Sequence, residues 1–150
     1  MSVLRFVIVP AIAGFLAACG PAPVAPTADP ATDSGYVQTV RQLEAIDREA
    51  EKFFQQGKGD DAAALIEKGQ PLEKRVLEVP RPAYDAVAAA SDLDDLYGRM
   101  LLSNHHYGWA RLLFQKNLAR WKHWVPATAE SARRLKQAED EIAECDRHLD

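Results

Sequence analysis

Residues 93–126, LDDLYGRMLLSNHHYGWARLLFQKNLARWKHWVP, decide the fold of this chain. The stretch holds all three tryptophans of the protein and three of its four histidines. Apolar residues recur at three- and four-residue steps on both sides of Asn104 and His105, and this period is typical of amphipathic helices. We therefore expect two helices joined by a short turn, forming the central hairpin of a small all-helical domain.

The second half of this stretch carries one apolar stripe and many cations. The stripe consists of Ala110, Leu113, Phe114, Asn117, Trp121 and Trp124. Between Tyr107 and Val125 there is no acidic residue, and the cations are Arg111, Lys116, Arg120 and Lys122. Together with His105 and His106, these cations could form a basic surface that binds anionic lipid, cell-wall polymer or an acidic partner. In the alternative, which the stripe favours, the tryptophans are core residues and the cations only a solvated face.

Helical periodicity continues on both sides of this hairpin, and no stretch has the alternation of a strand. We expect an all-α fold of about five helices, over residues 36–56, 60–78, 83–103, 107–125 and 128–149. Asp60 is the expected N-cap of the second helix, and Gly69 and Pro71 should kink or interrupt it. The third helix could restart near Ser91 or Asp92.

The fifth helix has its own apolar stripe, made of Leu135, Ala138, Ile142, Cys145 and Leu149. Asp60-Asp61 and Asp94-Asp95 are interpreted as acidic pairs at helix starts, where they favour the helix dipole.

A shift of 46 residues aligns 50–80 with 96–126, so that Val79-Pro80 falls on Val125-Pro126. Agreement is confined to apolar positions and helix ends, as expected for two copies of one helical hairpin. In the second copy, Gly98, Ala110 and Phe114 have a spacing that resembles the tetratricopeptide repeat. Asp94 and Leu101 stand where that family has aromatic residues. The resemblance implies two antiparallel hairpins in a solenoid-like array closed by the fifth helix, and an irregular bundle is the alternative.

The first residues of the chain have the form of a secretion signal. Arg5 gives a charged start, and residues 6–15 form an apolar run too short to span a bilayer. Residues 16–19, Leu-Ala-Ala-Cys, resemble the lipobox of bacterial lipoproteins. That resemblance implies cleavage after residue 18, a lipid on the Cys19 sulfur, and acylation of the new N-terminus. Gly20 after the cysteine favours the outer membrane by the sorting pattern of the family.

These signals divide the chain into three parts. We expect a signal peptide over 1–18, the lipidated cysteine with a Pro- and Ala-rich tether over 19–35, and a helical domain over 36–150. A hydrophobic content of 47% suits one globular domain, and a net charge of −4 gives no signature of nucleic-acid binding.

The sequence offers few candidate metal-binding or catalytic residues. His105-His106 with His123, or Cys145 with His148, could be proposed as metal ligands, but no second pair has zinc-site spacing, so we expect neither a metal nor a cofactor. No catalytic Ser/His/Asp grouping, phosphate-binding loop or redox cysteine pair is recognisable in the sequence.

Three classes of function remain open. We favour a lipid-anchored, non-catalytic interaction module on the periplasmic face of the outer membrane, with a protein partner in the envelope. The second is an envelope-binding structural protein that uses the basic helix. The third is an enzyme with a site around His105, His106 and Asn117.

Overall fold

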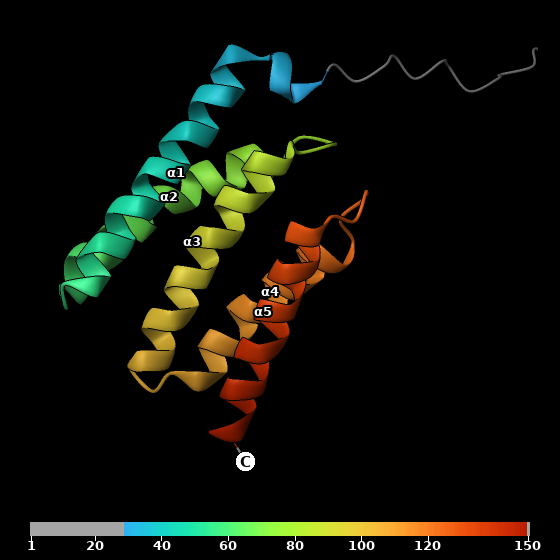
Figure 1. Ribbon diagram of the computed structural model, residues 1–150. Helices are drawn as coiled ribbons and strands as arrows, with labels where there is room; N and C mark the ends of the chain where they lie inside the picture. The colour runs from blue at the N-terminus through green and yellow to red at the C-terminus, as the bar shows by residue number, and fades with distance from the viewer. Residues whose placement is uncertain (1–28, 150) are drawn as a thin grey trace, which may run out of the picture.

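The computed structural model describes residues 29–149 (Figure 1). Cys19, the predicted signal peptide and most of the predicted tether lie outside the described residues. Helices account for 82% of the described part, and it has no strands, so the predicted all-α class is confirmed. The elements are η1 Pro30–Thr32, α1 Ser34–Gln55, α2 Gly59–Leu77, α3 Tyr84–Ser103, α4 Tyr107–Lys122 and α5 Ala129–Arg147.

Local side chains explain two of the helix starts. The Asp33 carboxylate accepts hydrogen bonds from the backbone N–H groups of Gly35 and Tyr36, so α1 starts two residues earlier than expected, at Ser34. Thr128 and Ser131 form a reciprocal capping box at the start of α5. The two oxygens satisfy backbone donors that the first helical turn leaves free.

The expected cap at Asp60 is wrong, and neither of the helix interruptions that the sequence allowed occurs. Asp60 is not a cap: α2 starts at Gly59 after Lys58, which makes no capping bond, and Asp60 lies in the first turn. Helix α2 runs unbroken through Pro71, and α3 runs unbroken through Ser91. Gly69 of α2 lies against the side chain of Leu93, and a β-carbon at this position would be 2.8 Å from it.

Successive helices run antiparallel, as the ribbon of Figure 1 shows. Helices α1 and α2 form one hairpin, and α3 packs against both. Helix α4 pairs with α3 as the second hairpin, and α5 packs along α4 as the closing helix. No helix in the described part is long and apolar enough to cross a membrane.

The buried apolar residues form two separate clusters. The larger one joins α1, α2 and α3 and includes Leu43, Val76, Leu93 and Leu96. The smaller one joins α4 to α5 through Ala110, Phe114 and Cys145, with Leu101, Leu102 and Ile142 packed around them. Leu149, expected on the α5 stripe, is exposed because α5 ends at Arg147. Polar side chains of α3 pair with α4 and α5, while Leu101 and Leu102 of α3 contact the smaller cluster directly.

Candidate functional site

Three of the four cations of α4 are used in ion pairs within the protein. Arg111 pairs with Asp146 of α5 at 2.5 Å between Nε and Oδ1. Lys116 reaches Glu73 of α2 at 2.7 Å and Asp94 of α3 at 2.9 Å. Arg120 reaches the same two carboxylates at 2.6 and 2.5 Å. Lys122, the fourth, is exposed.

Glu73, Asp94, Lys116 and Arg120 thus form an ion cluster that ties α2, α3 and α4 together. Two acids face two bases, so the cluster carries no net charge, and both carboxylates are buried. The expectation that Asp94-Asp95 begins a helix is wrong: both residues lie in the middle of α3. Sequence reasoning missed this cluster because its acids come from two other helices.

Asn117 has a structural role beside the ion cluster. Its Nδ2 donates to the Ser91 carbonyl at 2.9 Å, and its Oδ1 accepts from Arg120 at 2.8 Å. Both ends of the amide are therefore occupied. Asn117 thus makes two hydrogen bonds within the fold, whereas His105 and His106 lie at the turn before α4.

The four histidines do not all meet at one site, although two of them contact Tyr107. His105 hydrogen-bonds to the Tyr107 hydroxyl at 2.6 Å, and His148 stacks on the Tyr107 ring. His106 and His123 lie at opposite ends of α4. Cys145 is fully buried, whereas His148 is exposed. Among the described residues, no group of three or more His, Cys, Asp or Glu is arranged to hold a metal ion.

The three tryptophans separate into core and surface. Trp121 is 4% exposed and packs against Tyr84 and Trp124, with the Arg134 guanidinium 5.2 Å from its ring centre. The predicted inward stripe of α4 is therefore correct at Trp121. Trp109, in contrast, is 67% exposed.

Trp109 belongs to a groove that α3 and α4 form at their common turn. The groove has a volume of about 620 Å³ and is lined by Tyr97, Leu101, His106, Trp109, Leu112, Leu113 and Lys116. Leu113 and Lys116 also line an adjoining hollow of about 460 Å³ that extends to Leu77 and Glu78 at the end of α2. We call the two together the α3–α4 groove. The sequence stripe could not reveal it, because Trp109 and Leu112 lie off the stripe.

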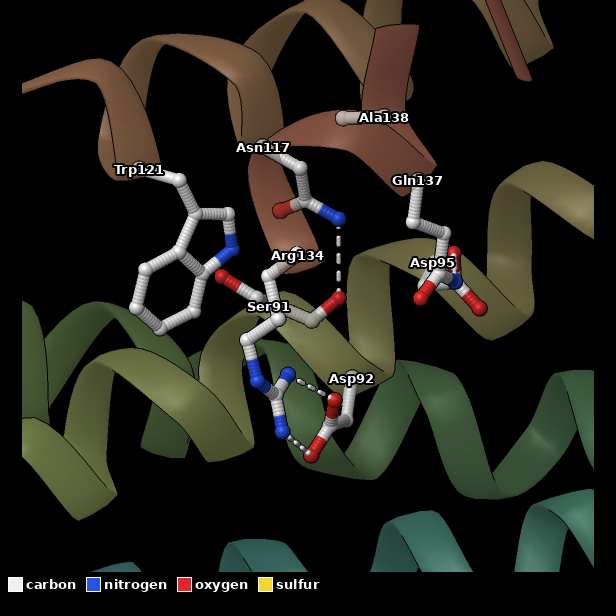
Figure 2. Close-up of a pocket in the computed structure, with 8 residues that line it drawn as sticks. All are labelled: Ser91, Asp92, Asp95, Asn117, Trp121, Arg134, Gln137 and Ala138. Carbon is white, nitrogen blue, oxygen red and sulfur yellow. Dashed lines mark hydrogen bonds and ion pairs between the residues drawn. The ribbon is translucent and has the colours of Figure 1, made fainter. Parts of the chain in front are cut away.

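A second polar region, between α3 and α5, encloses a cavity of about 20 Å³ (Figure 2). Arg134 of α5 pairs with Asp92 of α3 at 2.5 Å, and Gln137 donates to Asp95 at 2.9 Å. The Ser91 hydroxyl lines the cavity, is buried and has no hydrogen-bond partner. This volume suits one water molecule rather than a substrate.

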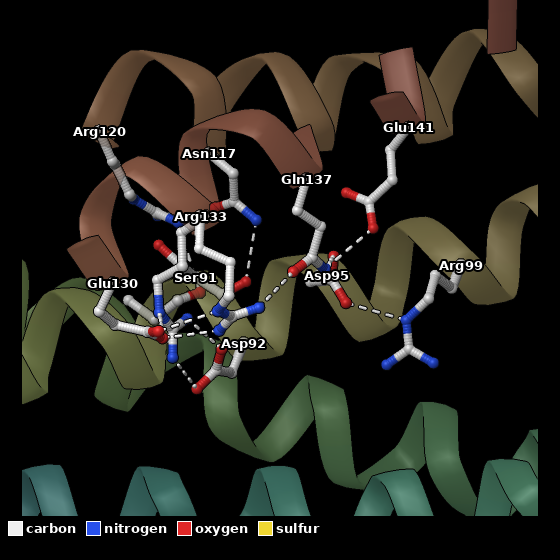
Figure 3. Close-up of polar contacts among 12 residues, drawn as sticks. Ser91, Asp92, Asp95, Arg99, Asn117, Arg120, Glu130, Arg133, Gln137 and Glu141 are labelled. Carbon is white, nitrogen blue, oxygen red and sulfur yellow. Dashed lines mark hydrogen bonds and ion pairs between the residues drawn. The ribbon is translucent and has the colours of Figure 1, made fainter. Parts of the chain in front are cut away.

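Figure 3 shows that the polar contacts continue along both helices: Arg99 binds Asp95 within α3, and Gln137 binds Glu141 within α5. Burial in this layer, followed by the neighbouring Asp95 carboxylate, raises the pKa of Glu141 to about 8. On the α1 side of α3, burial, Asp92 and Glu51 raise the pKa of Asp47 to about 7. Acids outnumber bases in this layer.

The groove is lined mainly by apolar side chains, and the polar layer contains two acids of raised pKa. No protein family, characterised protein or solved structure matches this chain. The likeness to the tetratricopeptide repeat therefore rests on Gly98, Ala110 and Phe114 and on the antiparallel helix order.

Proposed function

We propose that this protein is a lipid-anchored, non-catalytic interaction module on the periplasmic face of the outer membrane, which binds a protein partner in the α3–α4 groove. The anchor rests on the Leu-Ala-Ala-Cys box at 16–19. The observation that carries the binding function is the exposure of Trp109 and Leu112, at 67% and 54%, beside a groove of about 620 Å³. Exposed apolar surface that lines a groove is typical of protein–protein contacts, and tryptophan is enriched among residues that dominate them.

The charges around the groove define the chemistry of the partner. Lys116 is held by Glu73 and Asp94, and Lys74 pairs with Glu78. Since these charges are already neutralised, a charged segment would gain little there. An amphipathic helix that inserts apolar side chains between Trp109 and Leu101 fits the groove better.

The same ion pairs weigh against the envelope-binding function. A basic surface needs cations that are free to meet an anionic polymer. Three of the four cations on α4 are occupied by Asp146, Glu73 and Asp94, which leaves the exposed Lys122 as the main charge on this helix.

A photo-crosslinking amino acid at position 109 tests the groove in intact cells. We expect an adduct whose crosslinked peptide has apolar residues at helical spacing, and we expect Leu112→Asp in the same chain to weaken it severalfold. The matched control places the crosslinker at Lys136, an exposed position on α5. Equal adducts at both positions, or no adduct at 109, would refute the groove. Adducts with lipid or polymer alone would instead support the envelope-binding function.

The anchor is tested separately. Cys19→Ala should abolish incorporation of labelled fatty acid and leave the protein unprocessed or soluble, whereas Cys145→Ala should change neither labelling nor processing. If wild-type protein takes up no fatty acid and salt removes it from membranes, the proposed localisation is wrong.

A further inference from the structure

The layer that joins α5 to α3 contains more acids than bases. Asp92 and Asp95 of α3 and Glu141 of α5 face it, and the cations that reach them are Arg134 and Arg99. Arg134 is engaged by Asp92 and by Glu130. Arg99 is shared between Asp95 and Glu51 of α1, and Asp47 of α1 adds another carboxyl beside it. On the α4 side, Arg111 is taken by Asp146.

Glu141 is the member of this layer without a cation of its own. Its Oε1 accepts a hydrogen bond from Gln137 Nε2 at 3.1 Å, and the same nitrogen donates to Asp95 Oδ1 at 2.9 Å. One neutral amide therefore holds two carboxyl groups close together. The second oxygen of Glu141 is buried and has no hydrogen-bond partner.

Two adjacent carboxylates in a buried layer repel each other, and a buried charged oxygen without a partner is unfavourable. A proton on Glu141 removes both problems at once. We propose that α5 is a proton-dependent cover, docked on α3 and α4 while Glu141 is protonated and opened from both when Glu141 ionises. The proposal does not depend on the α3–α4 groove.

The direction of the effect follows from linkage. The docked helix holds the pKa of Glu141 at about 8, whereas in a released helix it returns toward its ordinary value of 4.5. Docking is therefore fully favoured below that ordinary value and is lost as the pH rises through about 8. Between the two values, the ratio of released to docked protein should rise about tenfold for each pH unit, and it should level off above pH 8.

Opening of α5 from α4 as well as from α3 would uncover Cys145, which lies one helical turn after Glu141 and is fully buried against Ala110 and Phe114 of α4. The alkylation rate of the Cys145 thiol therefore reports whether α5 is open. The experiment uses the full chain in mild detergent with Cys19→Ala, so that Cys145 is the only thiol. Alkylation is measured from pH 6 to 9 and divided, at each pH, by the rate in urea-denatured protein, which removes the titration of the thiol itself.

We expect this normalised rate to rise about tenfold per pH unit up to about pH 8 in the Cys19→Ala chain. Glu141→Gln keeps the contact with Gln137 and cannot ionise, so its rate should stay flat. Glu139→Gln removes the same charge from an exposed position of the same helix and should keep the rise. If the normalised rate of the Cys19→Ala chain itself does not change with pH, the proposal is wrong. This outcome does not depend on whether the Glu141→Gln or Glu139→Gln variant folds. An equal rise in the Glu141→Gln chain would overturn the proposal as well.

Discussion

Gly98 lies in the middle of α3 with the ring of Phe114 directly against its backbone. A β-carbon built at Gly98 would be 2.5 Å from the Phe114 ring. Phe114 is fully buried and cannot give way into solvent. The Gly98–Ala110–Phe114 spacing, noted in the sequence only as a likeness to the tetratricopeptide repeat, falls at this contact between α3 and α4.

Replacing Gly98 tests this contact. Gly98→Ala should lower the free energy of unfolding by about 1–2 kcal/mol, since overpacking costs about 1–3 kcal/mol and alanine recovers up to about 1 kcal/mol in helix propensity. Urea unfolding followed by circular dichroism measures the change. In Gly108→Ala, the new methyl group meets nothing within 4 Å, so this variant should be neutral or slightly more stable. Equal stability of the two variants would mean that α3 and α4 do not pack as described.

At the scale of elements, α4 shows what periodicity can predict and what it cannot. The inward stripe through Ala110, Phe114 and Trp121 is correct, because burial follows from spacing within one helix. The partners of Lys116 and Arg120 could not be predicted, since Glu73 and Asp94 lie 43 and 26 residues away from the cations that they bind. Asp60 was expected to cap α2 by a local rule, but α2 begins one residue earlier, at Gly59.

The ion cluster makes a prediction about α4 as an element. The Arg120 side chain is 12% exposed and bridges both buried carboxylates. Arg120→Ala should therefore lower the free energy of unfolding by about 3 kcal/mol, because Glu73 and Asp94 stay buried with only Lys116 to neutralise them. Lys122→Ala, on the exposed side of the same helix, should change it by less than about 0.5 kcal/mol. Thermal and urea unfolding of both variants distinguish a structural cluster from a set of surface charges.

At the scale of the whole molecule, the sequence predicted the class, the number of helices and their order, which depend on apolar spacing and on turn residues. It could not predict that the pKa values of Asp47 and Glu141 are raised in the fold. The acids Asp92 and Glu51 lie near Asp47 in the fold, and Arg99 offsets them only in part. That environment arises from packing between helices, so the sequence of a single helix does not reveal it.

These acids should make the stability of the protein fall with rising pH. The pKa of Asp47 is raised to about 7 in the folded state, so its favourable contribution is complete below its ordinary value and disappears as the pH rises through about 7. Asp47→Asn should therefore stabilise the protein more at pH 8.5 than at pH 5.5, by on the order of 1–2 kcal/mol. Urea unfolding at the two pH values measures this difference. Glu49→Gln, at an exposed position of α1, should show no such pH dependence.

The division of the apolar interior into two clusters has a consequence for cooperativity. Helices α1, α2 and α3 share a large cluster, whereas α4 and α5 share a small one with the end of α3 and also join the other helices through ion pairs. Local unfolding costs least where few apolar contacts are lost, so α4 and α5 can open while the first three helices persist. The persistent half is the one that directly follows the proposed anchor. Helices α1, α2 and α3 would thus stay folded during local opening of α4 and α5, and α3 contacts both parts of the molecule.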